Sequence, residues 1–379
     1  MQPDLDPALG RLLEPVRKAA TAAAAGVDAD GVFPAAAVQA LRDSGLLGLT
    51  LPAESGGLGA GPAQFAEVTF TLAEACGSTA MVYLMHVSAA MTVAAAAPAG
   101  MQGLLAELAT GRQLATLAFS ERGSRSHFWA PVSQAVPDGT GVRVRAEKSW
   151  VTSAAHAELF VISTLSPGGG ATDIDLYAVP GGTPGLAVAG PWRGMGLRGN
   201  DSAPMSVDVH LAPGQRIGET GAGFGLMMGT VLPWFNLGNA AVSLGLASAA
   251  ADAAVRHARG ARFEQLGQSL AELPTIRARL ARMSLQLATQ RSYLATAAAS
   301  IAAPDDGTTL HVLGVKAAAN DAALAITDEA MRVCGGAAFS AHLQLERYFR
   351  DARAGHVMAP TADALYDFYG KAITGQPLF

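Results

Sequence analysis

Two short segments hold residue types that can bind a planar heterocyclic ring. The first, 120–127, reads SERGSRSH and is rich in hydroxyls and small residues, and the second, 148–152, joins hydroxyls to Trp150. A hydroxyl can form a hydrogen bond to the edge of such a ring, while an indole face can stack on it. The same residues are also typical of a hairpin loop and of a core tryptophan, so the two segments alone leave both interpretations open.

A glycine-rich segment at 194–199 matches the dinucleotide-binding pattern G-x-G-x-x-G. That pattern holds a pyrophosphate only where it follows a buried strand and opens a helix. Here it follows Pro191-Trp192-Arg193 and leads into Asn200-Asp201-Ser202, which is typical of a loop. The sequence context therefore argues against a nicotinamide site.

Other catalytic motifs are missing from the sequence. It contains neither H-E-x-x-H nor G-x-S-x-G, so we expect no metal site and no serine-hydrolase chemistry. His86 lies in an apolar stretch, which is typical of an interior histidine. Cys76 and Cys334 are too far apart to indicate a disulfide framework or a metal cluster, and this cysteine usage fits the cytoplasm.

The composition describes a chain with little charge. Of its 379 residues 50% are hydrophobic and 15% are charged, against roughly 25% charged in an average soluble domain. So few charges indicate oligomer interfaces. The formal net charge of -5 gives no basic footprint, so we expect no nucleic-acid partner. The weakly polar stretch 83–101 is mostly alanine and contains Pro98, and the N-terminus has no apolar core, so we expect neither a membrane span nor a signal peptide.

The spacing of apolar residues changes twice along the chain. Apolar spacing favours helices before residue 112 and again after 225, and short period-two runs between them favour strands of a small antiparallel barrel or sandwich. The predicted helices span 34–47, 62–76, 78–96, 99–110, 226–262, 270–303, 309–334 and 342–373; the predicted strands span 114–119, 142–147, 159–164, 174–179 and 205–211. In the helix 270–303, Ile276, Leu280, Met283, Leu287 and Leu294 share one face, which is typical of a bundle seam.

The order and spacing of five segments resemble the acyl-CoA dehydrogenase family of flavoproteins. The segments 120–126, 150–152, 262–267, 334–339 and 348–353 are similar to its T-E-P-x-x-G-S-D, W-I-T, R-x-x-F-G, Q-x-x-G-G-x-G-[FY] and Y-R-D-A-[KR] motifs. The resemblance covers roughly 34–374. It implies an α+β fold with an N-terminal helical domain at 1–112, a central antiparallel β-barrel at 113–216 and a C-terminal four-helix bundle at 217–379.

The resemblance also implies an FAD site. It places two groups of residues, those at the subunit's own flavin and those that reach the FAD of a neighbouring subunit. The first group is Ser120, Ser126, Trp150, Thr152 and Thr361, with Thr152 near the flavin N5; the second is Arg262, Gly335 and Gly336. Arg332 is a further expected cofactor-binding residue. Because residues of one subunit would reach the FAD of another, the resemblance implies a homotetramer or homodimer. The chain departs from the motifs at Arg122, His127, Arg332 and Ala338, where the family has Pro, Asp, Gln and Gly.

The largest departure concerns the catalytic base. The family's dehydrogenation uses a carboxylate that removes the substrate α-proton while the β-hydride passes to the flavin. Its glutamate usually stands in an E-G-T motif, and a gap-free match places Ala359-Pro360-Thr361 there. Some members carry it early in the first bundle helix, where 232–236 (LPWFN) has no acid and also lacks the arginine that usually follows.

Asp363 is the candidate base that the sequence offers near this position. It lies two residues after Thr361, where an aspartate is also an ordinary capping choice and where the family has a cofactor-contacting glutamine. Glu121 and His356 are further candidates. Because both usual positions lack a glutamate, the base stays open at this stage.

Three functions are therefore open. The first is FAD-dependent α,β-dehydrogenation of an acyl thioester, with acyl-CoA, another acyl thioester and electron-transfer flavoprotein as partners. The second is a flavin monooxygenase of the same fold, which uses reduced flavin from a flavin reductase and O2 and needs no such carboxylate. The third is a non-catalytic flavin-binding subunit. Since Asn236 stands where the family often has arginine, a carrier-protein thioester or an aromatic compound is a further substrate option.

Overall fold

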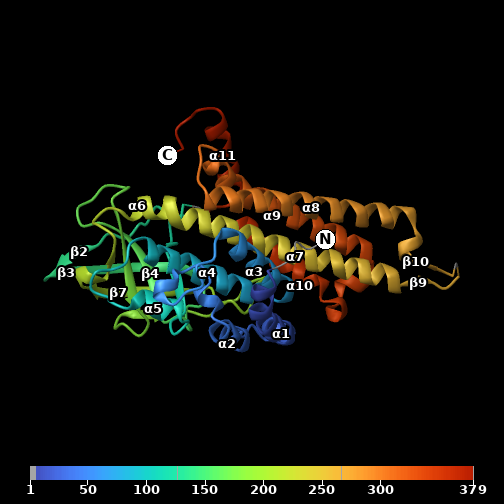
Figure 1. The fold of residues 1–379 in the computed structure, drawn as a ribbon, viewed down its shortest axis with the longest axis horizontal. Coiled ribbons are helices and arrows are strands. Elements are labelled where there is room, and N and C mark those ends of the chain that lie inside the picture. The colour runs from blue at the N-terminus through green and yellow to red at the C-terminus, as the bar shows by residue number, and fades with distance from the viewer. Residues whose placement is uncertain (1–5, 126, 266, 379) are drawn as a thin grey trace.

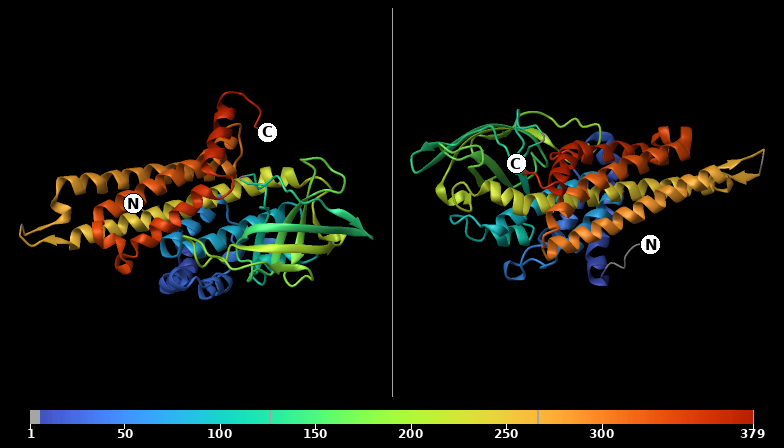
Figure 2. Two further views of the ribbon diagram at one scale, coloured as in Figure 1. Left: turned by 180° about the vertical axis from the view of Figure 1, so that it is seen from behind. Right: turned by 90° about the horizontal axis from the view of Figure 1, so that it is seen from above.

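The computed structural model describes residues 6–125, 127–265 and 267–378. The molecule is elongated, with two β-sheets at one end and long helices extending away from them (Figure 1). Two further views show the same division, with the sheets gathered at one end of the bundle (Figure 2).

The N-terminal part is helical, as predicted. Its helices are α1 (Pro7–Asp30), α2 (Ala35–Asp43), α3 (Pro62–Ala75), α4 (Gly77–Ala95) and α5 (Leu104–Ala109). Helix α1 begins where the Asp6 side chain accepts a hydrogen bond from the amide of Ala8 at 2.9 Å, ahead of Pro7 in the first turn. Within the described residues, α4 is the helix that is long and apolar enough to cross a membrane, but 83% of its apolar window is buried inside the protein. It is therefore the central helix of the core.

The middle part consists of two four-stranded sheets, with orders β1-β4-β5-β8 and β2-β3-β7-β6. The strands are β1 (Ala115–Ala118), β2 (Val136–Asp138), β3 (Gly141–Val151), β4 (Leu159–Leu165), β5 (Ile174–Pro180), β6 (Leu186–Val188), β7 (Ala203–Leu211) and β8 (Arg216–Ile217). A closed antiparallel barrel is not confirmed, and β1 pairs with β4 in parallel. Period-two patterns show that a strand has one buried face, but they do not show which strand lies beside it.

The C-terminal part is a helical bundle. It contains α6 (Gly223–Leu226), a π-turn (Met227–Val231), α7 (Leu232–Gly260), α8 (Pro274–Ala302), α9 (Thr308–Cys334), α10 (Leu345–Val357) and α11 (Ala362–Ile373), and β9 (Arg262–Phe263) and β10 (Gln268–Ser269) form a hairpin between α7 and α8. Helix α7 packs against α3 and α9. An added Cβ at Gly245 of α7 would lie 2.3 Å from the carbonyl oxygen of Phe70, so the close crossing with α3 requires glycine.

The single helix predicted over 342–373 is wrong. The chain forms α10 and α11, separated by a loop at Met358–Thr361. Pro360 interrupts the helix because it has no N–H to donate and restricts the residue before it. This break matters for function, since the loop borders the cavity described below.

The chain leaves the N-terminal helices at Ala109 and enters β1 at Ala115, and it leaves β8 at Ile217 and enters α6 at Gly223. The limits at 112/113 and 216/217 stay predictions of where folding units divide.

Candidate functional site

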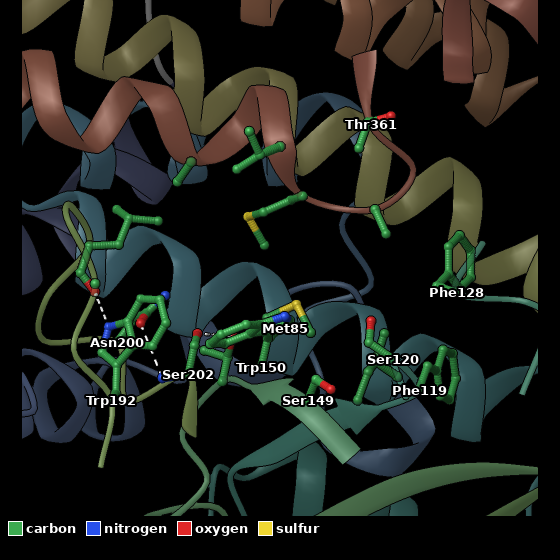
Figure 3. Close-up of a pocket in the computed structure, with 18 of the residues that line it drawn as sticks. Met85, Phe119, Ser120, Phe128, Ser149, Trp150, Trp192, Asn200, Ser202 and Thr361 are labelled. Carbon is green, nitrogen blue, oxygen red and sulfur yellow. Dashed lines mark hydrogen bonds between the residues drawn. The ribbon is translucent and has the colours of Figure 1, made fainter. Parts of the chain in front are cut away.

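A cavity of about 1390 Å³ lies between the loops of the sheets and the helices α4, α7 and α10 (Figure 3). Its walls differ in character. Aromatic and hydroxyl side chains come from the sheets, apolar ones come from the helices, and arginines complete the lining. The sheet wall includes Phe119, Ser120, Phe128, Ser149, Trp150, Thr152, Trp192, Asn200 and Ser202; the helical wall includes Met85, Val231, Phe235, Ala354, Val357, Met358, Ala359 and Thr361.

A bulge in β3 turns Trp150 toward the cavity. The register between β3 and β7 shifts between Lys148 and Val151, and Trp150 has a φ of 58°. A left-handed conformation is unfavourable for a bulky residue and is typical of functional sites. The indole is 65% exposed and its ring meets Trp192 edge-on at 5.8 Å between centroids. The bulge thus presents a broad aromatic face that a flat ligand can contact.

The hydroxyls beside this face are held in place. Thr152 Oγ1 lies 3.0 Å from Ser202 Oγ, and the carbonyl of Thr152 accepts a hydrogen bond from Thr116 Oγ1 at 2.7 Å. The amide of Ser149 donates to the carbonyl of Ser120 at 2.8 Å, which ties the loop after β1 to β3. Two segments far apart in the sequence therefore form one rigid polar edge.

A buried ion pair fixes the same loop. Lys148 Nζ donates to Glu121 Oε1 at 2.6 Å, and the Glu121 carboxylate also accepts from the amides of Val132 and Ser133 and from Ser133 Oγ. Burial alone raises the pKa of the Glu121 carboxyl, but Lys148 and the hydrogen bonds from Ser133 outweigh burial and lower the pKa. Since its oxygens are occupied, Glu121 holds the loop and is not free to accept a substrate proton.

Arginines give the cavity a positive lining. Arg350 and Arg353 are neutralised, the first by Asp28 and Glu346 and the second by Asp328. Arg122, Arg125 and Arg193 also line the cavity and are exposed, and within the described ranges none of the three has an ion-pair partner. Exposed, unpaired guanidinium groups suit phosphate oxygens, which they can bind through two parallel hydrogen bonds.

The cavity contains little that can remove a proton. Among the described residues that line it, Glu121 is the one carboxylate. Asp363 lies in the first turn of α11, is exposed and does not line the cavity, and His356 does not line it either. Burial raises the pKa of Asp351 to about 6, but this carboxylate is fully enclosed and accepts a hydrogen bond from the amide of Leu197. Asn236 is also buried and donates to the carbonyl of Val312 at 2.8 Å.

The structure brings together four of the residues expected at the flavin: Ser120, Trp150, Thr152 and Thr361 all line the cavity (Figure 3). Ser126 lies outside the described residues. The other residues expected to bind the cofactor lie elsewhere. Arg262 is in the β9–β10 hairpin, at the end of the bundle away from the sheets (Figure 1). Arg332, Gly335 and Gly336 lie at the end of α9, and none of these four lines the cavity.

Sequence reasoning missed several lining residues. Trp192 lies just before the glycine-rich segment 194–199, which was set aside as a dinucleotide motif, and Ser202 lies just after it. Trp192 was the available signal, since it is an aromatic residue that precedes a loop. The sequence did not indicate that its ring would contact Trp150. The described residues contain no group of three or more His, Cys, Asp or Glu that could hold a metal ion.

Comparisons with known proteins cover nearly the whole chain. The N-terminal, middle and C-terminal domains of acyl-CoA dehydrogenase match residues 12–112, 116–209 and 221–373. The chain is 30% identical over 352 residues to the short-chain specific acyl-CoA dehydrogenase of mitochondria from Bos taurus, covering 90% of this chain and 82% of that protein.

Solved structures show the same fold. Butyryl-CoA dehydrogenase from Megasphaera elsdenii superposes with a TM-score of 0.91 at 21% identity, covering 99% of this chain and 100% of that one. The structure of PigA with FAD and proline gives a TM-score of 0.86 at 18% identity and covers 99% of both chains.

Proposed function

Because this chain belongs to the acyl-CoA dehydrogenase family, flavin-dependent oxidoreductases that act on CH–CH donors, we propose that it catalyses the α,β-dehydrogenation of an acyl thioester. The observation that supports this proposal most is the cavity itself. It joins a polar, aromatic wall to an apolar helical wall, as a site for a flat cofactor and an acyl chain requires.

FAD is the family's cofactor, and the residues present fit it. The exposed face of Trp150 suits the isoalloxazine ring, and the hydroxyls of Ser120, Thr152 and Thr361 suit its polar edge. When bound, FAD accepts the hydride from the substrate. Ser149 and Ser202 are added to the residues expected to position it, since both support the same edge.

The helical wall suits the acyl group. Met85, Val231 and Phe235 line it with apolar surface from α4 and α7. Burying such a chain favours binding by roughly 25 cal/mol for each Å² of apolar area. The side-chain amide of Asn236 donates to the carbonyl of Val312 on α9 and carries no positive charge. Any phosphate of the thioester would therefore be bound by arginines of the sheet wall.

The α-proton has no acceptor in direct contact among the described lining residues. We keep Asp363 as the proposed base, reached from the cavity through a water molecule beside Thr361, because it is the exposed carboxylate two residues from that wall. The lack of a free lining carboxylate favours one second candidate, a flavin monooxygenase that uses reduced flavin and O2.

The partners that we propose follow the family. They are an acyl-CoA or another acyl thioester, including one on a carrier protein, and electron-transfer flavoprotein or a flavin reductase. Copies of the chain would assemble as a homotetramer or homodimer, in which Arg262, Gly335 and Gly336 reach the FAD of a neighbour. The proposed location is the cytoplasm.

Anaerobic stopped-flow absorbance of the FAD-loaded protein with a panel of acyl-CoAs tests this function. Bleaching of the oxidised flavin band is expected, and Asp363→Asn should slow it by about 10²–10⁴-fold. An unchanged rate in that variant rejects Asp363 as the base. Absence of bleaching, with product formed only from NADH, a reductase and O2, would establish the monooxygenase instead. Failure to take up FAD would exclude both enzyme functions.

A further inference from the structure

A lysine is buried in the helical bundle behind the cavity wall. Lys316 of α9 has 0% of its surface exposed. Its Nζ donates to Asn320 Oδ1 at 3.1 Å and to the carbonyls of Gly355, Met358 and Pro360 at 2.8, 3.2 and 2.9 Å. All four acceptors are neutral, and within the described residues no carboxylate forms an ion pair with it.

These carbonyls belong to the end of α10 and the loop Met358–Thr361. The last four carbonyls of a helix have no partner within the helix, and positive charge is favourable there. Lys316 supplies both the hydrogen bonds and the charge from a different helix. It thereby binds the end of α10 to α9 at the point where Pro360 interrupts the chain.

A polar network holds the ammonium in turn. Asn320 accepts from Lys316 and donates through Nδ2 to Asn239 Oδ1 at 2.9 Å and to Ser243 Oγ at 2.7 Å, both on α7. A Cβ added at Gly355 would lie 2.6 Å from Asn320 Nδ2 and from Ser243 Oγ. The end of α10 therefore approaches this network as closely as a glycine allows.

The loop that Lys316 holds forms part of the cavity wall. Met358, Ala359 and Thr361 line the cavity, while Pro360 lines a second, smaller cavity behind it. Burial lowers the pKa of Lys316 to about 7, so keeping a lysine here is costly. An apolar residue would fill the same space without that cost, but it would leave three carbonyls unpaired.

We propose that Lys316 is a positioning residue, whose buried ammonium fixes the loop Met358–Thr361 and so sets the place of Ala359 and Thr361 in the cavity wall. One of the two measurements below, FAD dissociation with the visible spectrum, rests on the proposed FAD site; the other, amide hydrogen exchange of the loop, does not. The inference requires no thioester, so it stands or falls separately from the dehydrogenation itself.

Lys316→Met tests it, with Lys18→Met as the matched control because Lys18 is exposed on α1. In the FAD-loaded protein we expect amide hydrogens of residues 358–364 to exchange at least tenfold faster in Lys316→Met, and FAD to dissociate about tenfold more readily with an altered visible spectrum. The loss of hydrogen bonds to a charged group changes an equilibrium constant by about tenfold. Lys316→Gln keeps N–H donors and should recover part of both effects, while Lys18→Met should match the unsubstituted protein.

Gly355→Ala provides a second variant should Lys316→Met fail to fold. It keeps the lysine but pushes the end of α10 from the network, and faster exchange over 358–364 is expected again. Exchange and flavin spectra like those of the unsubstituted protein in both Lys316→Gln and Gly355→Ala would overturn the proposal. A lowered melting temperature in Lys316→Met with an unchanged loop and spectrum would also overturn it, because that result describes a residue of the core alone.

Discussion

Placing a carboxylate at Ala359 should speed flavin reduction by an acyl thioester. Ala359 lines the cavity from the loop after α10, and the motif resemblance assigns to it the position of the family's catalytic glutamate. The described lining residues offer no other free carboxylate, since Glu121 is occupied by Lys148. A general base contributes about 10²–10⁴-fold in total, and Asp363 is proposed to supply part of this through water. Ala359→Glu should therefore raise the rate constant for reduction by the remaining part, and by up to the full range in the Asp363→Asn background.

Anaerobic single-turnover stopped flow measures this rate constant directly. Ala354→Glu is the control, because Ala354 also lines the cavity but lies on α10, before the loop. We expect acceleration in Ala359→Glu alone, with a rate that increases with pH as the new carboxyl ionises. Equal rates in both variants and in the unsubstituted protein would refute the reasoning that proton removal limits the rate of flavin reduction.

Three further predictions concern stability and binding. Glu121→Gln or Lys148→Met should each lower the free energy of unfolding by about 3–5 kcal/mol, because each leaves a buried partner unpaired. The double variant should lose less than the sum of the two losses. Urea denaturation measures these free energies, and additive losses would contradict the coupling of the two residues. His86 accepts from the amide of Ala115 and contacts the carbonyl of Leu47, and burial lowers its pKa to about 4. The unfolded chain binds that proton near pH 6.5, so stability is complete above this pH and falls by up to about 3 kcal/mol toward pH 4, a loss that His86→Gln should reduce. Arg122→Gln and Arg193→Gln should raise KM for an acyl-CoA several-fold but leave KM for the matching acyl-pantetheine, which has no phosphate, unchanged; an equal change for both substrates would exclude phosphate binding.

The sequence was sufficient to predict the order of helices, strands and helices, because the periodicity of buried residues changes with the element. It did not predict how the strands pair. The parallel pairing of β1 with β4 joins segments more than forty residues apart, and no local pattern reports such a contact.

The candidate site was predicted in part for the same reason. Trp150 lies on β3 and Thr152 directly follows that strand, and motif resemblance found both, but the bulge that turns Trp150 outward depends on the pairing of β3 with β7. Lys316 gave no signal at all, since a lysine in a helix is ordinarily taken to be on the surface. Its role depends on carbonyls about forty residues further along the chain.

Mass analysis of the product from anaerobic reaction with an acyl thioester tests the dehydrogenation most directly. The FAD-loaded protein should bleach stoichiometrically and release a thioester lighter than the substrate by two hydrogens. A panel of acyl-CoAs and carrier-bound thioesters that leaves the flavin oxidised and every substrate mass unchanged would contradict it.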